Sequence, residues 1–142
     1  LSSGLQSPWY LDLKKVLLLS RGVYLIGRII SELLQEEAYT AVGGYGLGGQ
    51  LMTSAIVATS CPANRSICGF YILEQNELKE DDPERRITSP GDLVIKGYFP
   101  PGGCAVALVD DVLTSGKSLG RAIKAVRTNG CRIGQIVVII DR

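Results

Sequence analysis

The chain has 142 residues and a mass of 15.2 kDa, a size typical of one domain with a single core. Fifteen Lys and Arg against 14 Asp and Glu leave a net charge of +1, which excludes the strongly basic surface typical of nucleic-acid and acidic-membrane binders. Histidine is absent, so Ser-His-Asp catalysis, histidine-ligated zinc and a histidine pH switch are also excluded. Any chemistry must use carboxylates, hydroxyls, Lys, Arg or backbone amides.

Cysteine usage and the apolar runs indicate the cellular setting. Four cysteines are present, Cys61, Cys68, Cys104 and Cys131. They form no C-x-x-C pair, so we expect free, mostly buried thiols. The longest apolar runs, such as residues 136–140, are far shorter than the roughly 20 residues that span a bilayer. We therefore predict a cytoplasmic protein that binds neither membranes nor nucleic acids.

The first half of the chain predicts a strand, a glycine-rich loop and flanking helices. Apolar residues at helical spacing predict a helix from residue 23 into the polar stretch 35–37. Residues 38–42 predict a short strand, and residues 43–49 contain five glycines and predict a loop. The following stretch, residues 50–59, is compatible with a second helix.

Two further strands and a charged connection are expected in the middle of the chain. Residues 66–73 are rich in Ile, Phe and Tyr and predict a strand, and the charged stretch 74–90 predicts a solvated connection. A short strand is predicted over residues 92–98. Residues 104–109 form a nearly continuous apolar run, which is typical of a strand buried on both faces of a parallel sheet.

The last elements complete an α/β pattern. Leu119, Ile123 and Val126 share one face of a predicted helix, which the Asn-Gly pair at residues 129–130 would end. Residues 135–140 predict the final strand. Alternating strands and helices predict a parallel α/β sheet with right-handed crossovers, in which ligands bind at the carboxyl ends of the strands.

The most informative segment is residues 106–119. A hydrophobic strand delivers Asp110 and Asp111 to its carboxyl end, and a Thr-Ser-Gly loop opens the next helix. Free N–H groups at a helix start, with the hydroxyls of Thr114, Ser115 and Ser118, make a phosphate cradle. Ionised carboxylates only accept hydrogen bonds, so the acid pair suits the vicinal diol of a ribose.

Two simpler interpretations of this segment are weaker. The acids could merely end a strand and Ser118 merely cap a helix, but that leaves the ordered pattern around them without a reason. A P-loop requires glycine five residues before Gly116, and Asp111 stands there, so a P-loop is excluded.

The same segment resembles the phosphoribosyl-pyrophosphate (PRPP) binding motif of type I phosphoribosyltransferases, which is a hydrophobic strand, two acids, two apolar residues and Thr-[Thr/Ser/Ala]-Gly. Within that family, residues 3–12 are similar to the Ser-Gly-Arg-x-Ser-Pro-aromatic-aromatic segment of orotate phosphoribosyltransferases. Residues 139–142 are similar to their closing strand with its Asp-Arg. The likeness covers most of the chain in the family's order. It implies that residues 1–142 are one Rossmann-like α/β domain with helices on both faces, incomplete at both ends.

The resemblance also implies an activity. The family moves the ribose 5-phosphate of PRPP onto a base, here a pyrimidine with orotate as the best match, and releases pyrophosphate. Mg²⁺ would be held by ligand oxygens near Asp110 and Asp111, with no direct protein ligand, and the protein would be a homodimer.

The resemblance assigns roles to individual residues. PRPP would be bound by Asp110, Asp111, Leu113, Thr114, Ser115, Gly116, Lys117 and Ser118. Pyrophosphate would be wrapped by Tyr45, Gly46, Leu47, Gly48 and Gly49. The base would contact Tyr10, Thr114 and Arg142. The catalytic residues would be Asp110 and Asp111, joined by Lys79.

The chain departs from the family after residue 73. Orotate phosphoribosyltransferases carry a basic loop of the form Arg-Lys-Glu-x-Lys-Asp-His-Gly, whereas residues 73–82 read Leu-Glu-Gln-Asn-Glu-Leu-Lys-Glu-Asp-Asp. Lys79 is the predicted substitute for that loop, with Arg85 and Arg86 as alternatives. The acidic loop also leaves open a second hypothesis, a PRPP- or nucleotide-binding sensor or regulator with weakened turnover.

A third hypothesis is a dinucleotide-binding oxidoreductase domain. It is suggested by the spacing Gly44-x-Gly46-x-x-Gly49 after a short strand, with Glu74 at the end of the next strand. This interpretation does not explain residues 110–118.

Overall fold

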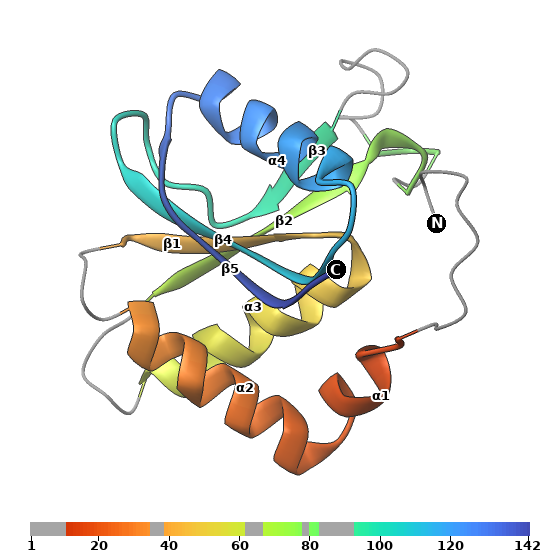
Figure 1. The fold of residues 1–142 in the computed structure, drawn as a ribbon. Coiled ribbons are helices and arrows are strands. Elements are labelled where there is room, and N and C mark those ends of the chain that lie inside the picture. Colours follow the sequence, from red (N-terminus) through yellow and green to blue (C-terminus); the bar gives the residue numbers. More distant parts are fainter. Residues whose placement is uncertain (1–10, 35–38, 62–66, 78–79, 83–92) are drawn as a thin grey trace.

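The structure, a computed structural model, describes residues 11–34, 39–61, 67–77, 80–82 and 93–142 (Figure 1). The strands in these segments are β1 (Ala41–Tyr45), β2 (Cys68–Glu74), β3 (Leu93–Gly97), β4 (Ala105–Leu113) and β5 (Arg132–Asp141). The helices are α1 (Lys14–Leu17), α2 (Ser20–Leu33), α3 (Gly46–Ser60) and α4 (Lys117–Thr128), with a 3-10 turn, η3 (Gln75–Glu77), directly after β2.

The strands form one sheet in the order β3-β2-β1-β4-β5. β1 lies between β2 and β4 and is parallel to both, and β4 is parallel to β5. β3 is antiparallel to β2, so the prediction of a parallel sheet is wrong for this edge strand. The reason is that β3 starts where β2 ends, with Leu93 opposite Glu74, whereas a parallel neighbour needs a crossover back to the other end of the sheet.

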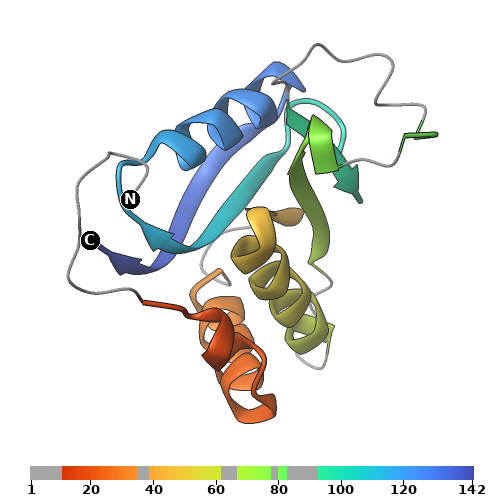
Figure 2. The same cartoon turned by 90° about the vertical axis from the view of Figure 1, so that its right-hand side faces the viewer.

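Helices cover both faces of the sheet, as predicted. α1, α2 and α3 lie on one face and α4 lies on the other (Figures 1 and 2). Along β4, Ala107 and Val109 pack in the cluster with α2 and α3, whereas Val106 and Leu108 pack in the cluster with α4. Successive strand residues point to opposite faces, so a strand covered on both faces is apolar throughout. This arrangement explains the continuous apolar run seen in the sequence.

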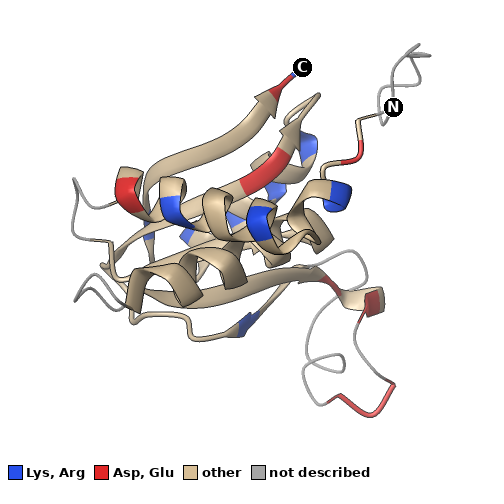
Figure 3. Cartoon of the chain, turned by 90° about the horizontal axis from the view of Figure 1, so that it is seen from below, with Lys and Arg blue, Asp and Glu red and all other residues tan. Residues whose placement is uncertain are grey.

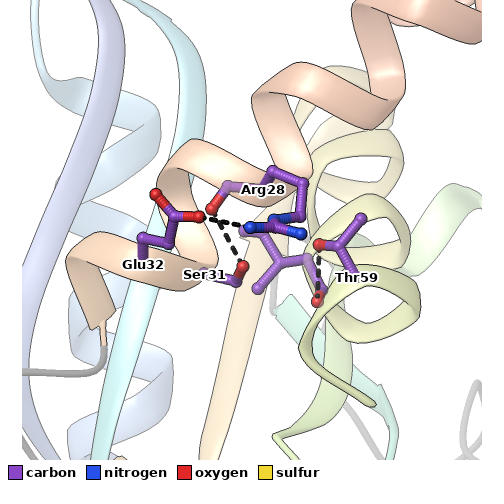
Figure 4. A network of polar contacts seen from close by, with 5 residues as sticks. Arg28, Ser31, Glu32 and Thr59 are labelled. Atoms are coloured by element: carbon purple, nitrogen blue, oxygen red, sulfur yellow. Dashed lines mark hydrogen bonds and ion pairs between the residues drawn. The ribbon is translucent and has the colours of Figure 1, made fainter. Parts of the chain in front are cut away.

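A glycine lets α2 and α3 approach closely. A Cβ on Gly27 would lie 2.6 Å from the Ala55 carbonyl oxygen, so a larger residue there would push the helices apart. The Thr59 hydroxyl donates to that same carbonyl at 2.8 Å, and Arg28 pairs with Glu32 at 2.6 Å on the exposed side of α2 (Figure 4). Together α2 and α3 form one layer on the same face of the sheet.

The first glycine-rich stretch is not the loop predicted over residues 43–49. β1 runs to Tyr45 and α3 begins at Gly46, so the strand passes directly into the helix. A Cβ on Gly43 would lie 2.0 Å from the Phe70 ring, which explains a glycine inside a strand. These glycines allow close packing between elements, and the prediction of a loop over this stretch is wrong.

Several other details differ from the sequence-based expectations. β4 extends through both acids to Leu113 and does not end at residue 109. Helix α1 was not predicted. All four cysteines are free, as predicted, but only Cys131 is buried, so the expectation of mostly buried thiols is wrong. Among the described helices, none combines the length and apolar character that a membrane span requires.

Candidate functional site

A pocket of about 300 Å³ lies at the carboxyl edge of the sheet, where β1 passes into α3 and β4 leads into α4. It is lined by Lys14, residues 45–48 and residues 110–119. This position is the one expected for a ligand in an open α/β sheet, because the carboxyl ends of parallel strands meet at one edge.

The pocket brings together the two segments, residues 45–49 and 110–118, that the sequence analysis expected to bind the same ligand. The predicted residues that line it are Tyr45, Gly46, Leu47, Gly48, Asp110, Asp111, Leu113, Thr114, Ser115, Gly116, Lys117 and Ser118. Gly49 and Arg142 are not among the described lining residues. Arg142 is nevertheless close by, because its backbone N–H donates to the Leu113 carbonyl at 2.9 Å. Tyr10, Lys79, Arg85 and Arg86 lie outside the described residues.

The two acids are the last polar groups that β4 carries into the pocket. The Asp111 N–H donates to Asp110 Oδ1 at 2.9 Å, and the Val112 N–H donates to Asp111 Oδ1 at 3.0 Å. Burial, reinforced by the neighbouring charge of Asp111, raises the pKa of Asp110 to about 6. A partly buried carboxylate pair of this kind favours a ligand that supplies hydroxyl donors or a cation.

The start of α3 lies against this acid pair. A Cβ on Gly48 would lie 2.4 Å from Asp111 Cγ, so any side chain at position 48 would displace the carboxylate. A Cβ on Gly44 would lie 2.1 Å from the Gly49 carbonyl oxygen, which shows how closely strand and helix pack at this turn. The first turn of α3 can approach Asp111 only because these positions are glycine.

Two helices begin at the pocket, and no side chain caps either of them. Gly116, with φ of +72°, is the N-cap of α4, and Gly46, with φ of +64°, is the first residue of α3. Both adopt a left-handed conformation that glycine tolerates best. Backbone N–H groups at the start of a helix have no partner within it and favour an anion. The pocket is therefore suited to a ligand with two anionic groups.

Positive side chains complete the pocket. Lys14 and Lys117 line it together with the acids of β4, so both charge signs share this edge of the sheet (Figure 3). Lys14 was missed by sequence reasoning. It is held by the short helix α1, whose Leu17 is only 1% exposed and packs in the core. The helical spacing of Leu13 and Leu17 is the signal that could have revealed it.

The donor set also suits a particular kind of metal site. Within the described segments, no three Cys, Asp or Glu side chains are grouped to hold a metal ion. Mg²⁺ usually keeps several waters and is bound through one or two carboxylates together with substrate phosphates. Asp110 and Asp111, beside two helix starts that favour anions, suit a Mg²⁺ ion that a phosphate-bearing ligand holds through its own oxygens.

Comparison with known proteins identifies relatives of this chain. No family model matches it. It is 34% identical to the orotate phosphoribosyltransferase of Aquifex aeolicus over 142 residues, covering all of this chain and 72% of the relative. It is 33% identical to the enzyme of the same name from Sorangium cellulosum over 143 residues, covering 70% of that protein.

Solved structures agree with this result. Mycobacterium tuberculosis orotate phosphoribosyltransferase with inorganic phosphate superposes with a TM-score of 0.75 at 29% identity, covering all of this chain and 71% of that one. The same enzyme in complex with PRPP gives a TM-score of 0.74 at 29% identity and 72% coverage. Leishmania tarentolae adenine phosphoribosyltransferase shares the fold, with a TM-score of 0.69 at 17% identity, 95% coverage of this chain and 66% of that one. The chain belongs to the orotate phosphoribosyltransferase family and has the type I phosphoribosyltransferase fold.

Proposed function

We propose that this protein transfers the ribose 5-phosphate of PRPP to a ring nitrogen of orotate, which gives orotidine 5′-monophosphate and pyrophosphate. The observation that carries the proposal is that an acid pair and two uncapped helix starts line one pocket. PRPP has a matching order of groups, with a ribose diol between a 5′-phosphate and a pyrophosphate. Family membership supports the same reaction.

Each part of the pocket takes one part of PRPP. The start of α4, residues 113–118, binds the 5′-phosphate through backbone N–H groups and hydroxyls. Asp110 and Asp111 accept hydrogen bonds from the ribose hydroxyls. Residues 45–49, at the junction of β1 and α3, hold the pyrophosphate. Of these, residues 45–48 line the pocket, and Lys14 adds a positive charge to its lining.

The chemistry needs positioning more than it needs a strong base. The ring nitrogen forms a bond to C1 of the ribose while the bond from C1 to the pyrophosphate oxygen breaks, and the electron pair leaves with pyrophosphate. The proton of the ring nitrogen passes to the departing pyrophosphate or to water. The protein holds the two reactants in line and stabilises the departing negative charge with amide dipoles and cations. A chain without histidine can therefore perform this reaction. Mg²⁺, held near Asp110 and Asp111 through ligand oxygens, would neutralise part of the pyrophosphate charge.

Other parts of the proposal rest on the sequence. Thr114 lines the pocket and is proposed to contact the base, together with Arg142 and Tyr10. Lys79 is proposed as the catalytic cation that replaces the family's basic loop. A homodimer and a cytoplasmic location are also predictions.

A second candidate function is a PRPP sensor with little turnover. It is favoured by the acidic residues Glu74, at the end of β2, and Glu77, in η3, which stand where the family has basic residues. The dinucleotide hypothesis is less favoured, because Gly44 lies inside β1 and because it leaves residues 110–118 unused.

A steady-state assay separates these functions. Purified protein with Mg²⁺, PRPP and orotate should consume orotate and release equal amounts of pyrophosphate. Asp111→Asn should lower the rate by about 100-fold or more, because the ribose loses an ionised acceptor. Glu32→Gln, a change in an exposed ion pair on α2, is the control and should leave the rate unchanged.

The other outcomes are also decisive. PRPP binding without turnover on orotate, other pyrimidines or purines would contradict the transferase and support the sensor. Binding of NAD without PRPP would favour the dinucleotide hypothesis instead.

A further inference from the structure

Three side chains form a polar network beside the pocket. The guanidinium of Arg121 donates two hydrogen bonds to the Glu74 carboxylate, Nη1 to Oε1 at 2.6 Å and Nη2 to Oε2 at 2.9 Å. The hydroxyl of Tyr45 donates to the same Oε1 of Glu74. Paired guanidinium and carboxylate groups of this geometry are stronger and more directional than single hydrogen bonds.

The network joins three elements that are far apart in the sequence. Tyr45 is the last residue of β1, Glu74 is the last residue of β2, and Arg121 lies one turn into α4 after Lys117. Tyr45 lines the pocket, and the residue after it is Gly46 at the start of α3. The network therefore connects the beginning of α4 with the residue that leads into α3.

The two residues that open α3, Gly46 and Leu47, make fewer contacts than Gly48 and Gly49, which pack closely against Asp111 and β1. A Cβ on Gly46 would meet no heavy atom within 4 Å, and the side chain of Leu47 is 58% exposed. Gly46 also has a positive φ, which glycine adopts without steric cost, so no side chain at this position anchors the turn. The bond from Tyr45 to Glu74 is therefore a contact that can fix where the turn begins.

Electrostatic interactions keep the Glu74 carboxylate ionised and the Tyr45 hydroxyl protonated. Arg121 first and Tyr45 second hold the pKa of Glu74 below its ordinary value, so the carboxylate stays ionised at neutral pH. Burial, together with Glu74, raises the pKa of Tyr45 to about 12, so its hydroxyl keeps its proton and remains a donor. Arg121 also neutralises a carboxylate that would otherwise repel an anionic ligand nearby.

We propose that Arg121 is a positioning residue that acts through Glu74 on Tyr45 and thereby holds the start of α3 at the spacing from α4 that PRPP requires. This inference rests on the proposed function, because it assumes that one ligand bridges the two helix starts. It gives Arg121 and Glu74, which line no part of the pocket, a role in PRPP affinity.

Binding of PRPP with Mg²⁺, measured by calorimetry, tests the proposal. Arg121→Leu and Tyr45→Phe should each raise the Kd for PRPP by about tenfold, because a displaced turn no longer presents its amides to the ligand. Lys124→Leu, an exposed cation on the same helix, is the matched control and should leave the Kd unchanged. Arg121→Lys should restore only part of the affinity, because lysine cannot form the paired contact.

A double variant tests whether the three residues act as a unit. Tyr45→Phe combined with Arg121→Leu should weaken PRPP binding no more than the stronger single variant, because both remove the same support. In steady-state kinetics, the KM for PRPP should rise while the KM for orotate stays within about twofold. Far-ultraviolet circular dichroism should show an unchanged fold in each variant.

Three results would overturn the inference. The first is that Arg121→Leu binds PRPP as tightly as the wild type. The second is that the losses of PRPP binding free energy from Tyr45→Phe and Arg121→Leu add fully in the double variant. The third is that the KM values for PRPP and orotate rise together and the melting temperature falls. Each is distinguishable from failure of the proposed function, which would show as a wild-type protein that does not bind PRPP.

Discussion

The junctions β1–α3 and β4–α4 meet at one pocket but build it in different ways. β4–α4 presents side chains, two carboxylates followed by three hydroxyls and a lysine. β1–α3 presents mainly backbone, and glycines let its first helical turn lie against Asp111. One half of the pocket therefore offers side-chain groups, and the other half offers backbone in a shape that only glycines allow. Substitutions should therefore damage the two halves for different reasons.

The largest effect is expected at the contact between the two junctions. Gly48→Ala should lower kcat/KM by about 100-fold or more, because the added Cβ would lie 2.4 Å from Asp111 Cγ and must displace the carboxylate. Steady-state kinetics with PRPP and orotate measures the loss. A variant with nearly wild-type activity would show that the shape of β1–α3 is not required.

A smaller effect is expected from the lysine that sequence reasoning missed. Lys14→Ala should weaken binding of inorganic pyrophosphate with Mg²⁺ by about tenfold, because one of the two cations lining the pocket is lost. Its neighbour Lys15 is exposed and does not line the pocket, so Lys15→Ala is the matched control. Calorimetry measures both affinities. If the two variants bind pyrophosphate equally tightly, Lys14 does not contribute to pyrophosphate binding.

The acid pair should give a pH-dependent effect on stability. Burial raises the pKa of Asp110 from 3.8 to about 6, so the folded protein holds this proton more tightly than the unfolded chain. The stability that Asp110 contributes is therefore intact below about pH 4 and is lost as the pH rises through about 6. Asp110→Asn cannot ionise, so it should melt a few degrees (about 2–4 °C) above the wild type at pH 8.

Thermal unfolding at several pH values measures this difference. The gap between Asp110→Asn and the wild type should shrink to near zero at pH 4, where both carry a neutral side chain. A gap that persists at pH 4, or that has the opposite sign at pH 8, would contradict the assigned environment of Asp110. The same variant should bind PRPP more weakly, which would show a conflict between stability and function at this residue.

The smallest effect is expected from a glycine outside both junctions. Gly120 lies within α4, and a Cβ there would meet no heavy atom within 4 Å. Gly120→Ala should raise the free energy of unfolding by up to about 1 kcal/mol, since alanine favours a helix, and leave PRPP affinity unchanged. Denaturant unfolding and calorimetry measure the two quantities. Loss of PRPP affinity in this variant would mean that glycines matter here for reasons other than shape.

The sequence predicted the side-chain half of the site better than the backbone half. The strand and helix around residues 106–119 could be recognised because an apolar run, two acids and a hydroxyl-rich loop have separate, local signatures. Residues 43–49 were taken for a loop, because close approach between Gly43 and Phe70, or between Gly48 and Asp111, depends on partners distant in the sequence.

Other features missed by sequence reasoning have the same cause. The pairing of Arg121 with Glu74 joins residues 47 positions apart, and no local pattern marks it. The antiparallel direction of β3 depends on how the chain returns from the end of β2, which composition does not reveal. The order of most strands and helices was predictable from hydrophobic periodicity, whereas helices on both faces were implied by the family resemblance.

Calorimetric titration of PRPP with Mg²⁺ into the wild type, Gly48→Ala and Asp111→Asn tests most directly whether the two junctions form one site. If the junctions form one site, the wild type should bind one PRPP per chain, and a change at either junction should weaken binding at least about tenfold. A variant at either junction that binds PRPP as tightly as the wild type would contradict this prediction.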